Sequence, residues 1–315
     1  MSRPAGPLSG QGGGEPALEG VGGPAGEESD SPTSEQPPVE APVDRGPSAR
    51  RLLSGGIRLQ HHLARAPSSA ARDATRTGLI VVHGLPNSPG GAARAAQTFP
   101  ELADRIASDT GWASLSCAFR GASGSGGSFS PGNWLADLQA AIEFFRTEVS
   151  TVWLAGFGIG GTIALRAAAL DPAIGGVAVL GTPTDLTPWV SHPELLAQLA
   201  FDAGALPDGI PDDLSAWSQD LRTIDPLRSA AAVPPRPLLI VHGSADAEVA
   251  LVDARALNDA AEGQGDLRVV PMAGHRLRHD PRAIAVLLGW LERREAAPRE
   301  LPSAEAPANE RPGQI

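Results

Sequence analysis

The sequence predicts an α/β protein with a doubly wound, mostly parallel sheet and a small helical cap. Short, unbroken apolar runs alternate with longer stretches of helical periodicity. Strands that are apolar throughout are typical of a parallel sheet covered on both faces, and their alternation with helices indicates double winding. A long interval without a strand candidate, from residue 182 to 235, predicts the cap.

Six apolar runs are the candidate strands of the parallel sheet. They span residues 78–83, 113–119, 151–155, 176–180, 237–242 and 267–271. An earlier pair of strands is expected within 56–63, where apolar and polar residues alternate from Ile57 to Leu63 as in an exposed antiparallel edge. His61 and His62 would then point to opposite faces of that edge.

Two later segments have the spacing of a helix with one buried face. The stripes consist of Trp134, Leu138, Ala141 and Phe145 in the first, and Ala285, Leu288 and Leu291 in the second. Within the cap interval, two short helices are expected near 193–203 and 212–221. An insertion there would lie above the carboxyl ends of the strands, where open α/β sheets place their ligands.

Composition sets the domain limits. Residues 1–49 are rich in Gly, Pro, Ser and acidic side chains, so they cannot offset the entropy of folding, and they are expected to be a disordered tail. Residues 295–315 are expected to be a second tail. The single folded domain is therefore expected at 50–294, with its cap at about 183–235.

The net charge of −11 argues against nucleic acid or an anionic membrane as the main partner, because no basic stripe is available to displace counterions. Cys117 is the only cysteine, so an intrachain disulfide is excluded and a buried apolar role is expected. No apolar run approaches the length of a transmembrane helix, which predicts a cytoplasmic protein. No cofactor or metal is expected.

A turn between strand and helix carries the most specific signal. An apolar run, 151–155, is followed by a glycine-rich turn, 156–161, and then by a helical pattern, 162–170. A nucleophile elbow, G-x-S-x-G, has this setting, and it exposes a serine on a sharp turn above the sheet. Here Gly158 stands at the serine position.

Three further segments follow strands in the order that acyl-transfer chemistry needs. The first strand runs into His83-Gly84-Leu85, a turn whose backbone amides could face an oxyanion. Asp246 and His275 follow two later strands that are expected to be neighbours. A catalytic histidine is positioned by a carboxylate in this way, with its second nitrogen facing the reacting centre.

Together these motifs resemble the α/β-hydrolase family over nearly the whole domain, and most closely its serine aminopeptidase-like, or S33-like, branch. The segment 120–126 is similar to that branch's R-G-x-G-x-S-x-G loop. The resemblance implies Asp246 as the acid, His275 as the base, and the amides of Leu85 and Ile159 as the oxyanion hole. Gly158 departs from the family's pattern, because a glycine stands in place of the nucleophilic serine and ordinary serine catalysis is thereby removed.

Alternatives remain at several positions. The glycines at 156, 158 and 161 also satisfy the G-x-G-x-x-G dinucleotide fingerprint, with Asp185 as its acid. Asp185 is also a second candidate for the catalytic acid. His275 and His279 have a spacing that metal ligands use. The loop serines at 123, 125, 128 and 130 are candidates for a displaced nucleophile.

Two functions follow from these observations. The first is a hydrolase of ester or amide bonds in small apolar substrates, in which Asp246 and His275 activate water or another nucleophile. The second is a pseudoenzyme that binds a small molecule or a protein partner in the same pocket. A dinucleotide-binding protein is a lesser alternative.

Overall fold

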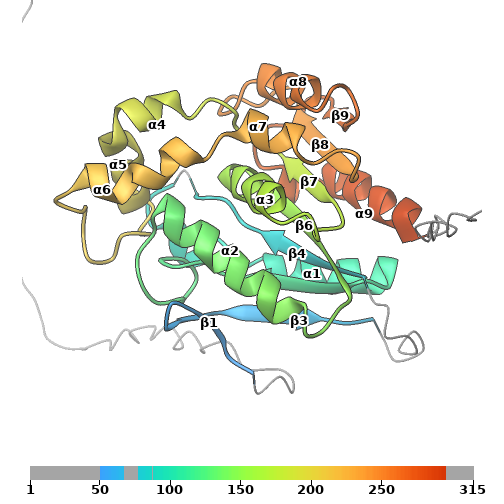
Figure 1. The fold of residues 1–315 in the computed structure, drawn as a ribbon, viewed down its shortest axis with the longest axis horizontal. Coiled ribbons are helices and arrows are strands. Elements are labelled where there is room, and N and C mark those ends of the chain that lie inside the picture. Colours follow the sequence, from blue (N-terminus) through green and yellow to red (C-terminus); the bar gives the residue numbers. More distant parts are fainter. Residues whose placement is uncertain (1–49, 67–76, 87, 296–315) are drawn as a thin grey trace, which may run out of the picture. The chain divides into compact units, whose positions relative to one another are not determined.

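The computed structural model describes residues 50–66, 77–86 and 88–295, which form an α/β fold with a mixed, mostly parallel sheet (Figure 1). The predicted tail 1–49 and residues 296–315 of the second tail lie outside the described residues. No helix among the described residues is both long and apolar enough to cross a bilayer.

The main sheet has the strand order β3-β5-β4-β6-β7-β8-β9 within the described chain. The strands are β3 (His61–Ala64), β4 (Thr77–Val82), β5 (Ala113–Cys117), β6 (Thr151–Phe157), β7 (Val177–Leu180), β8 (Leu238–Gly243) and β9 (Asp266–Val270). Strands β4 to β9 are parallel, and β3 pairs antiparallel with β5. The six predicted strands and the double winding are confirmed.

The segment 56–63 holds two strands, as predicted, but they do not pair with each other. It divides at Gln60 into β2 (Ile57–Leu59), which forms a hairpin with β1 (Leu52–Ser54), and β3, which joins the main sheet. The Gln60 backbone is held between the two strands by Ser125 Oγ and the Ala118 amide. The antiparallel edge is therefore β3 alone.

Helices cover both faces of the sheet, as double winding requires (Figure 1). One face packs against α2 (Pro131–Phe145), α3 (Ile159–Leu170) and α8 (Leu251–Ala260), and the other against α1 (Phe99–Thr110) and α9 (Pro281–Glu295). The His61 and His62 side chains lie on opposite faces of the sheet, as predicted. The His61 ring lies against Phe144 of α2, whereas His62 Nε2 lies 2.8 Å from Asp104 Oδ1 of α1.

The predicted stripe of α2 is wholly buried, and the helix begins where Ser130 Oγ accepts from the Asn133 amide at 3.1 Å. The predicted stripe of α9 was wrong at Ala285, which is exposed. The buried face of that helix passes through Ile284 and Leu287 instead, together with Leu288 and Leu291. Spacings of three and four residues align these four positions on one side of a helix.

The interval between β7 and β8 holds more helix than predicted. It contains α4 (Thr187–Ser191), α5 (Pro193–Asp202), α6 (Leu214–Ser218), the 3₁₀ turn η3 (Gln219–Thr223) and α7 (Pro226–Ala231). Helix α7 packs against α3 and α8, so it extends the layer on the sheet. Helices α4 to α6 lie beyond the carboxyl ends of the strands (Figure 1).

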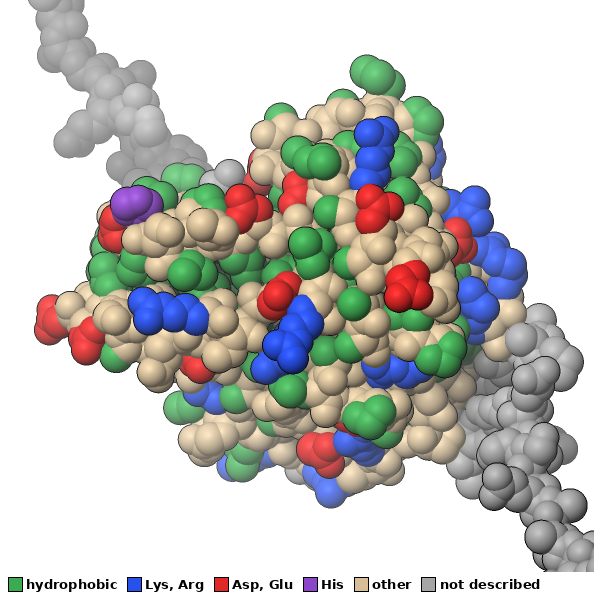
Figure 2. Space-filling model, turned by 45° about the horizontal axis from the view of Figure 1, so that its top comes forward, with side chains coloured by type: hydrophobic (Ala, Val, Ile, Leu, Met, Phe, Trp, Pro, Cys, Tyr) green, Lys and Arg blue, Asp and Glu red, His purple; other side chains and the backbone are tan. Residues whose placement is uncertain are grey.

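Backbone hydrogen bonds fasten these outer helices to two loops that leave the sheet. The Ala92 amide, after β4, donates to the Ala203 carbonyl, and the Phe129 amide, after β5, donates to the Ala205 carbonyl. Leu195 and Phe201 of α5 are exposed apolar side chains. Figure 2 shows hydrophobic side chains gathered at the left of this face of the molecule. The insertion is thus anchored to the loops that follow β4 and β5.

Candidate active site

Gly158 joins β6 to α3 in a conformation that few residues adopt. Its φ is 55° and its ψ is −130°, and Ile159 is already the first residue of the helix. The Gly158 amide donates to the Leu180 carbonyl at 2.9 Å, and its own carbonyl accepts from the Gly161 amide at 2.9 Å. The turn is therefore held on both sides, and its positive φ suits glycine because a side chain there is strained.

The other glycines of this turn are needed for close packing. A Cβ atom at Gly156 would overlap the start of α3, one at Gly160 would overlap the His83 carbonyl, and one at Gly161 would overlap Thr182. These glycines let α3 begin directly against three strands. The three glycines that also fit a dinucleotide fingerprint, 156, 158 and 161, are accounted for here by the close start of α3, by the positive φ of Gly158 and by the Thr182 side chain.

The structure brings Asp246 and His275 together from the ends of β8 and β9. His275 Nδ1 lies 3.0 Å from Asp246 Oδ2. The other carboxylate oxygen of Asp246 accepts from the amides of Glu248 and Val249, each at 2.9 Å. The Asp246 side chain is fully buried, whereas that of His275 is 24 % exposed, so the pair combines an anchored acid with an accessible imidazole.

The imidazole of this His275–Asp246 pair faces Gly158. A Cβ atom built at Gly158 would lie 3.5 Å from His275 Nε2. Apart from the chain neighbours of Gly158, only the His275 ring among the described residues comes within 4 Å of that Cβ. A side-chain oxygen one bond further on would come within hydrogen-bond reach of Nε2. The geometry of a nucleophile–histidine–acid arrangement is thus present without the nucleophilic oxygen.

Three residues not singled out from the sequence surround the pair. His242 Nε2 lies 3.0 Å from the Val249 carbonyl and 3.6 Å from Asp246 Oδ2, so it holds the loop that carries the acid. Glu248 Oε2 lies 3.9 Å from His275 Nε2, on the side away from Asp246. Gly181 lies beneath the pair, since a Cβ there would be 3.5 Å from His275 Nδ1. Only the position of Glu248, two residues after Asp246, could have pointed to one of them.

The turn after β4 lies directly against the elbow. A Cβ at Gly84 would be 2.8 Å from the Phe157 carbonyl oxygen and 3.8 Å from the Gly158 Cα. The buried His83 ring accepts from the Phe119 amide at Nε2, 3.0 Å away, so its proton is on Nδ1 and is donated to the Gly84 carbonyl, also at 3.0 Å. Burial lowers the pKa of His83 to about 4, which keeps the ring neutral near neutral pH.

The loop that follows β5 is fixed by a buried ion pair. Arg120 Nε and the Arg120 amide both donate to Asp137 of α2, at 2.8 Å each, and the guanidinium also reaches Asn133 and Ser54. Burial raises the pKa of the Asp137 carboxyl although Arg120 acts in the opposite direction. Arg120 therefore positions the loop and does not face His275.

The four loop serines have structural hydrogen bonds. Ser123 Oγ accepts from the Ala96 amide, Ser125 Oγ donates to the Ala118 carbonyl, and Ser128 Oγ donates to Asp208. The fourth, Ser130, caps α2. The interactions of these hydroxyls within the described chain do not include His275, which weakens the alternative of a displaced nucleophile.

The remaining alternatives lie apart from the pair. Asp185 is exposed and accepts from the Thr187 amide at 2.9 Å. Hydrogen bonds from the Thr187 side chain and then from its amide lower the pKa of the Asp185 carboxyl. His279 ends the 3₁₀ turn η4 (Leu277–His279), so it does not share an α-helical face with His275. No cluster of three or more potential metal ligands occurs among the described His, Cys, Asp and Glu side chains.

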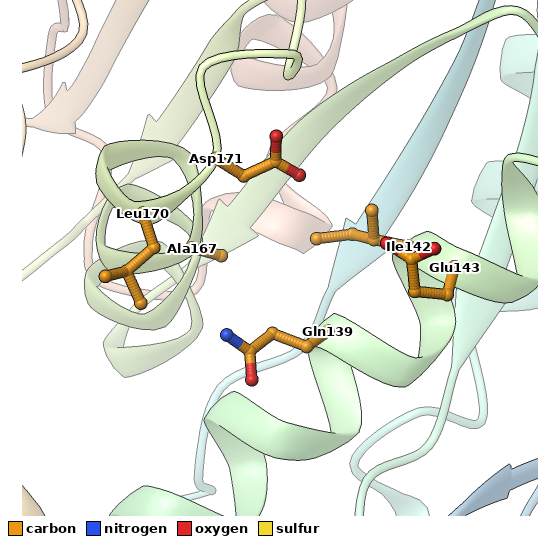
Figure 3. A pocket seen from close by; sticks show the side chains of 6 residues that line it. All are labelled: Gln139, Ile142, Glu143, Ala167, Leu170 and Asp171. Atoms are coloured by element: carbon orange, nitrogen blue, oxygen red, sulfur yellow. The ribbon is translucent and has the colours of Figure 1, made fainter.

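Two surface cavities lie away from these residues. One, of about 230 Å³, is bounded by Gln139, Ile142 and Glu143 of α2 and by Ala167, Leu170 and Asp171 across from them (Figure 3). Its two carboxylates are bridged by Arg146. The other, of about 300 Å³, lies between α1 and the start of α9. Neither is lined by Gly158, Asp246 or His275.

Solved structures with this fold are numerous, but no family model and no curated protein sequence matches the chain. Est1E from Butyrivibrio proteoclasticus, solved with ferulic acid bound, is 21% identical, with a TM-score of 0.57, over 78% of this chain and 98% of that one. The Pyrococcus furiosus esterase Pf2001 is 15% identical, with a TM-score of 0.54, over 78% and 88%. A bromoperoxidase from Bacillus anthracis is 19% identical, with a TM-score of 0.53, over 75% and 96%. The chain has the α/β-hydrolase fold.

Proposed function

We propose that this protein hydrolyses ester or amide bonds of small apolar substrates, with a water molecule that the His275–Asp246 pair activates in place of a serine. The observation that carries the proposal is the 3.5 Å approach of His275 Nε2 to the Cβ position of Gly158, combined with the 3.0 Å contact between His275 and Asp246. A buried acid that orients an exposed imidazole is the arrangement of a general base.

In this mechanism, a water molecule beside Gly158 gives a proton to His275 Nε2 as its oxygen attacks the carbonyl carbon. The amide of Ile159, at the start of α3, and that of Leu85 hold the developing oxyanion. When the tetrahedral adduct collapses, the leaving group takes the proton back from Nε2. Asp246 holds the ring through Nδ1 and stabilises the imidazolium between the two transfers.

Two further features support the assignment. The motifs around Gly84, Arg120, Asp246 and His275 favour the serine aminopeptidase-like branch, to which we assign the chain. The ferulic acid bound by Est1E, a small aromatic molecule, supports a small-molecule substrate for this fold. A substrate with an aromatic acyl group is therefore the first choice for a test.

The test is turnover of p-nitrophenyl esters, including aromatic ones, by the wild-type protein and by His275→Ala. General-base catalysis contributes about 10²–10⁴-fold, so the wild type should exceed His275→Ala by a factor in that range. Ser128→Ala, a loop change at a serine that bonds to Asp208, serves as a control that should retain full activity. Equal rates for wild type and His275→Ala would contradict the proposal.

A second function is favoured by Gly158 itself. A protein that keeps the fold but lacks the nucleophile could bind a small molecule or a protein partner without turnover. Ligand-induced stabilisation that is unaffected by His275→Ala, in the absence of turnover, would select this binding function.

A further inference from the structure

The proposed site combines a base with oxyanion donors, and no nucleophilic side chain of the described residues lies beside Gly158. His275 Nε2 is directed at the position beside Gly158. Apart from the chain neighbours of Gly158, only this imidazole among the described residues comes within 4 Å of a Cβ built on Gly158. The turn at Gly84 and the start of α3 both adjoin Gly158, since a Cβ at Gly84 would lie 3.8 Å from the Gly158 Cα and Ile159 begins the helix. A ligand atom can therefore occupy the place that a serine oxygen would otherwise fill.

We propose that the site also catalyses enolisation, in which His275 removes a proton from the carbon next to a substrate carbonyl. This inference rests on the same base and oxyanion donors as the proposed hydrolase. It goes beyond hydrolysis because the substrate needs no leaving group. The substrate class is neutral carbonyl compounds whose α-hydrogens are acidified by a neighbouring aromatic ring.

The geometry of the two reactions is closely related. In serine hydrolysis, the nucleophilic oxygen and the oxyanion are joined through a single carbon. In an enolate, the α-carbon and the charged oxygen are also joined through a single carbon, so the two three-atom units have nearly the same span. An α-carbon beside Gly158 would face His275 Nε2 while its carbonyl oxygen reached the amides of Leu85 and Ile159.

The reaction balances without another reagent. The α-C–H bond breaks, the proton moves to His275 Nε2, and the electron pair forms the enolate whose oxygen the amides hold. Return of a proton from Nε2 to the same carbon restores the ketone. In heavy water the returned proton becomes a deuteron, so the substrate gains deuterium without any net chemical change.

The acid side of the site suits this step. Asp246 is fully buried and accepts two backbone amides in addition to His275, so it remains in place while the imidazole gains charge. Glu248 Oε2, 3.9 Å from Nε2, adds a second carboxylate near the imidazolium. Two acidic side chains beside the imidazole disfavour negatively charged substrates, which is the reason for choosing neutral ketones.

The experiment follows deuterium uptake into phenylacetone and other aryl-substituted ketones by NMR in heavy water. A ketone has no leaving group, so hydrolysis cannot contribute to the signal. The wild type should accelerate exchange by about 10²–10⁴-fold over the same buffer, and His275→Ala should abolish this gain. Exchange by the wild type at the buffer rate for every ketone, or exchange that survives His275→Ala, would overturn the inference.

Gly158→Ala and Gly158→Ser form the matched pair for this test. Both add a Cβ near His275 Nε2, so both should reduce exchange at least tenfold, whereas only Gly158→Ser should gain ester turnover. Circular dichroism checks that each variant is folded. Exchange unaffected by Gly158→Ala in the folded variant would show that the proton is not removed beside Gly158, and would overturn the inference.

The outcomes separate the two proposals. Ester turnover that depends on His275, without ketone exchange, would support the hydrolase proposal and contradict the enolisation proposal. Ketone exchange that depends on His275, without ester turnover, would support the enolisation proposal and contradict the hydrolase proposal.

Discussion

Gly158 is the residue on which the chemistry of this site depends. Its φ of 55° places the chain in a region that side chains rarely adopt, and its Cβ position faces His275 Nε2. In a serine elbow the same conformation exposes the nucleophile, at a cost in backbone strain. Glycine removes that strain together with the hydroxyl.

Gly158→Ser should therefore increase ester hydrolysis by orders of magnitude and destabilise the fold by about 1–3 kcal/mol. The hydroxyl would lie within reach of His275 Nε2, and the new Cβ would restore strain at positive φ. Steady-state kinetics and urea unfolding measure the two effects, and a fluorophosphonate probe should label Gly158→Ser but not the wild type.

Gly158→Ala is the control for this substitution. It should show the same loss of stability with no gain in ester hydrolysis and no labelling, because it adds only the Cβ. A folded Gly158→Ser protein whose activity equals that of Gly158→Ala would show that the base and the oxyanion donors are not aligned for acyl transfer.

At the scale of elements, the loop between β5 and α2 depends on one buried ion pair. The Asp137 side chain is fully buried and that of Arg120 is 13% exposed. Arg120 also reaches Ser54 of β1, so it connects the loop to the first hairpin. Four serines of the same loop are used for hydrogen bonds, which makes the loop a framework for the site.

Arg120→Met should destabilise the protein by about 3–5 kcal/mol, because it leaves the Asp137 carboxylate buried and unpaired. The double variant Arg120→Met, Asp137→Leu should be less destabilised than Arg120→Met alone, since it removes the unpaired charge. Denaturant unfolding of wild type, both single variants and the double variant gives the coupling energy. Additive losses would show that the pair does not act as a unit.

At the scale of the whole molecule, the stability should depend on pH through His83. Its pKa is lowered by burial from 6.5 to about 4, so the unfolded chain binds more protons than the folded one between these values. The stability that comes from the neutral His83 ring is then fully present above pH 6.5 and is lost as the pH decreases toward 4. Between pH 7 and pH 5 this residue alone should account for a loss of about 2 kcal/mol.

His83→Gln should reduce that loss, because glutamine does not titrate and its amide offers both a donor and an acceptor near Gly84 and Phe119. Urea unfolding at pH 7 and pH 5 measures the difference for both proteins. The same pH dependence in wild type and variant would assign the loss to other groups.

The order of strands and helices could be predicted because it depends on local patterns. Apolar runs fix the six parallel strands, and α2 follows from its stripe and its Ser130–Pro131 start. A pair of strands in 56–63 was predicted, but the place of the break, at Gln60, could not be, since it depends on Ser125 and Ala118 from a distant loop. The exposure of Ala285 likewise depends on what α9 packs against.

The sequence by itself determined the fold class and the candidate elbow, acid and histidine, since each motif is a local run with its own spacing. Only the tertiary structure decided which residues meet: Asp246 lies beside His275, whereas Asp185 bonds to the Thr187 amide. It also decided that the imidazole faces Gly158, and that His242, Glu248 and Gly181 surround the pair. The physical reason is that parallel strands bring their carboxyl ends to one edge of the sheet, while the loops beyond them settle by packing and hydrogen bonds between residues far apart in the chain.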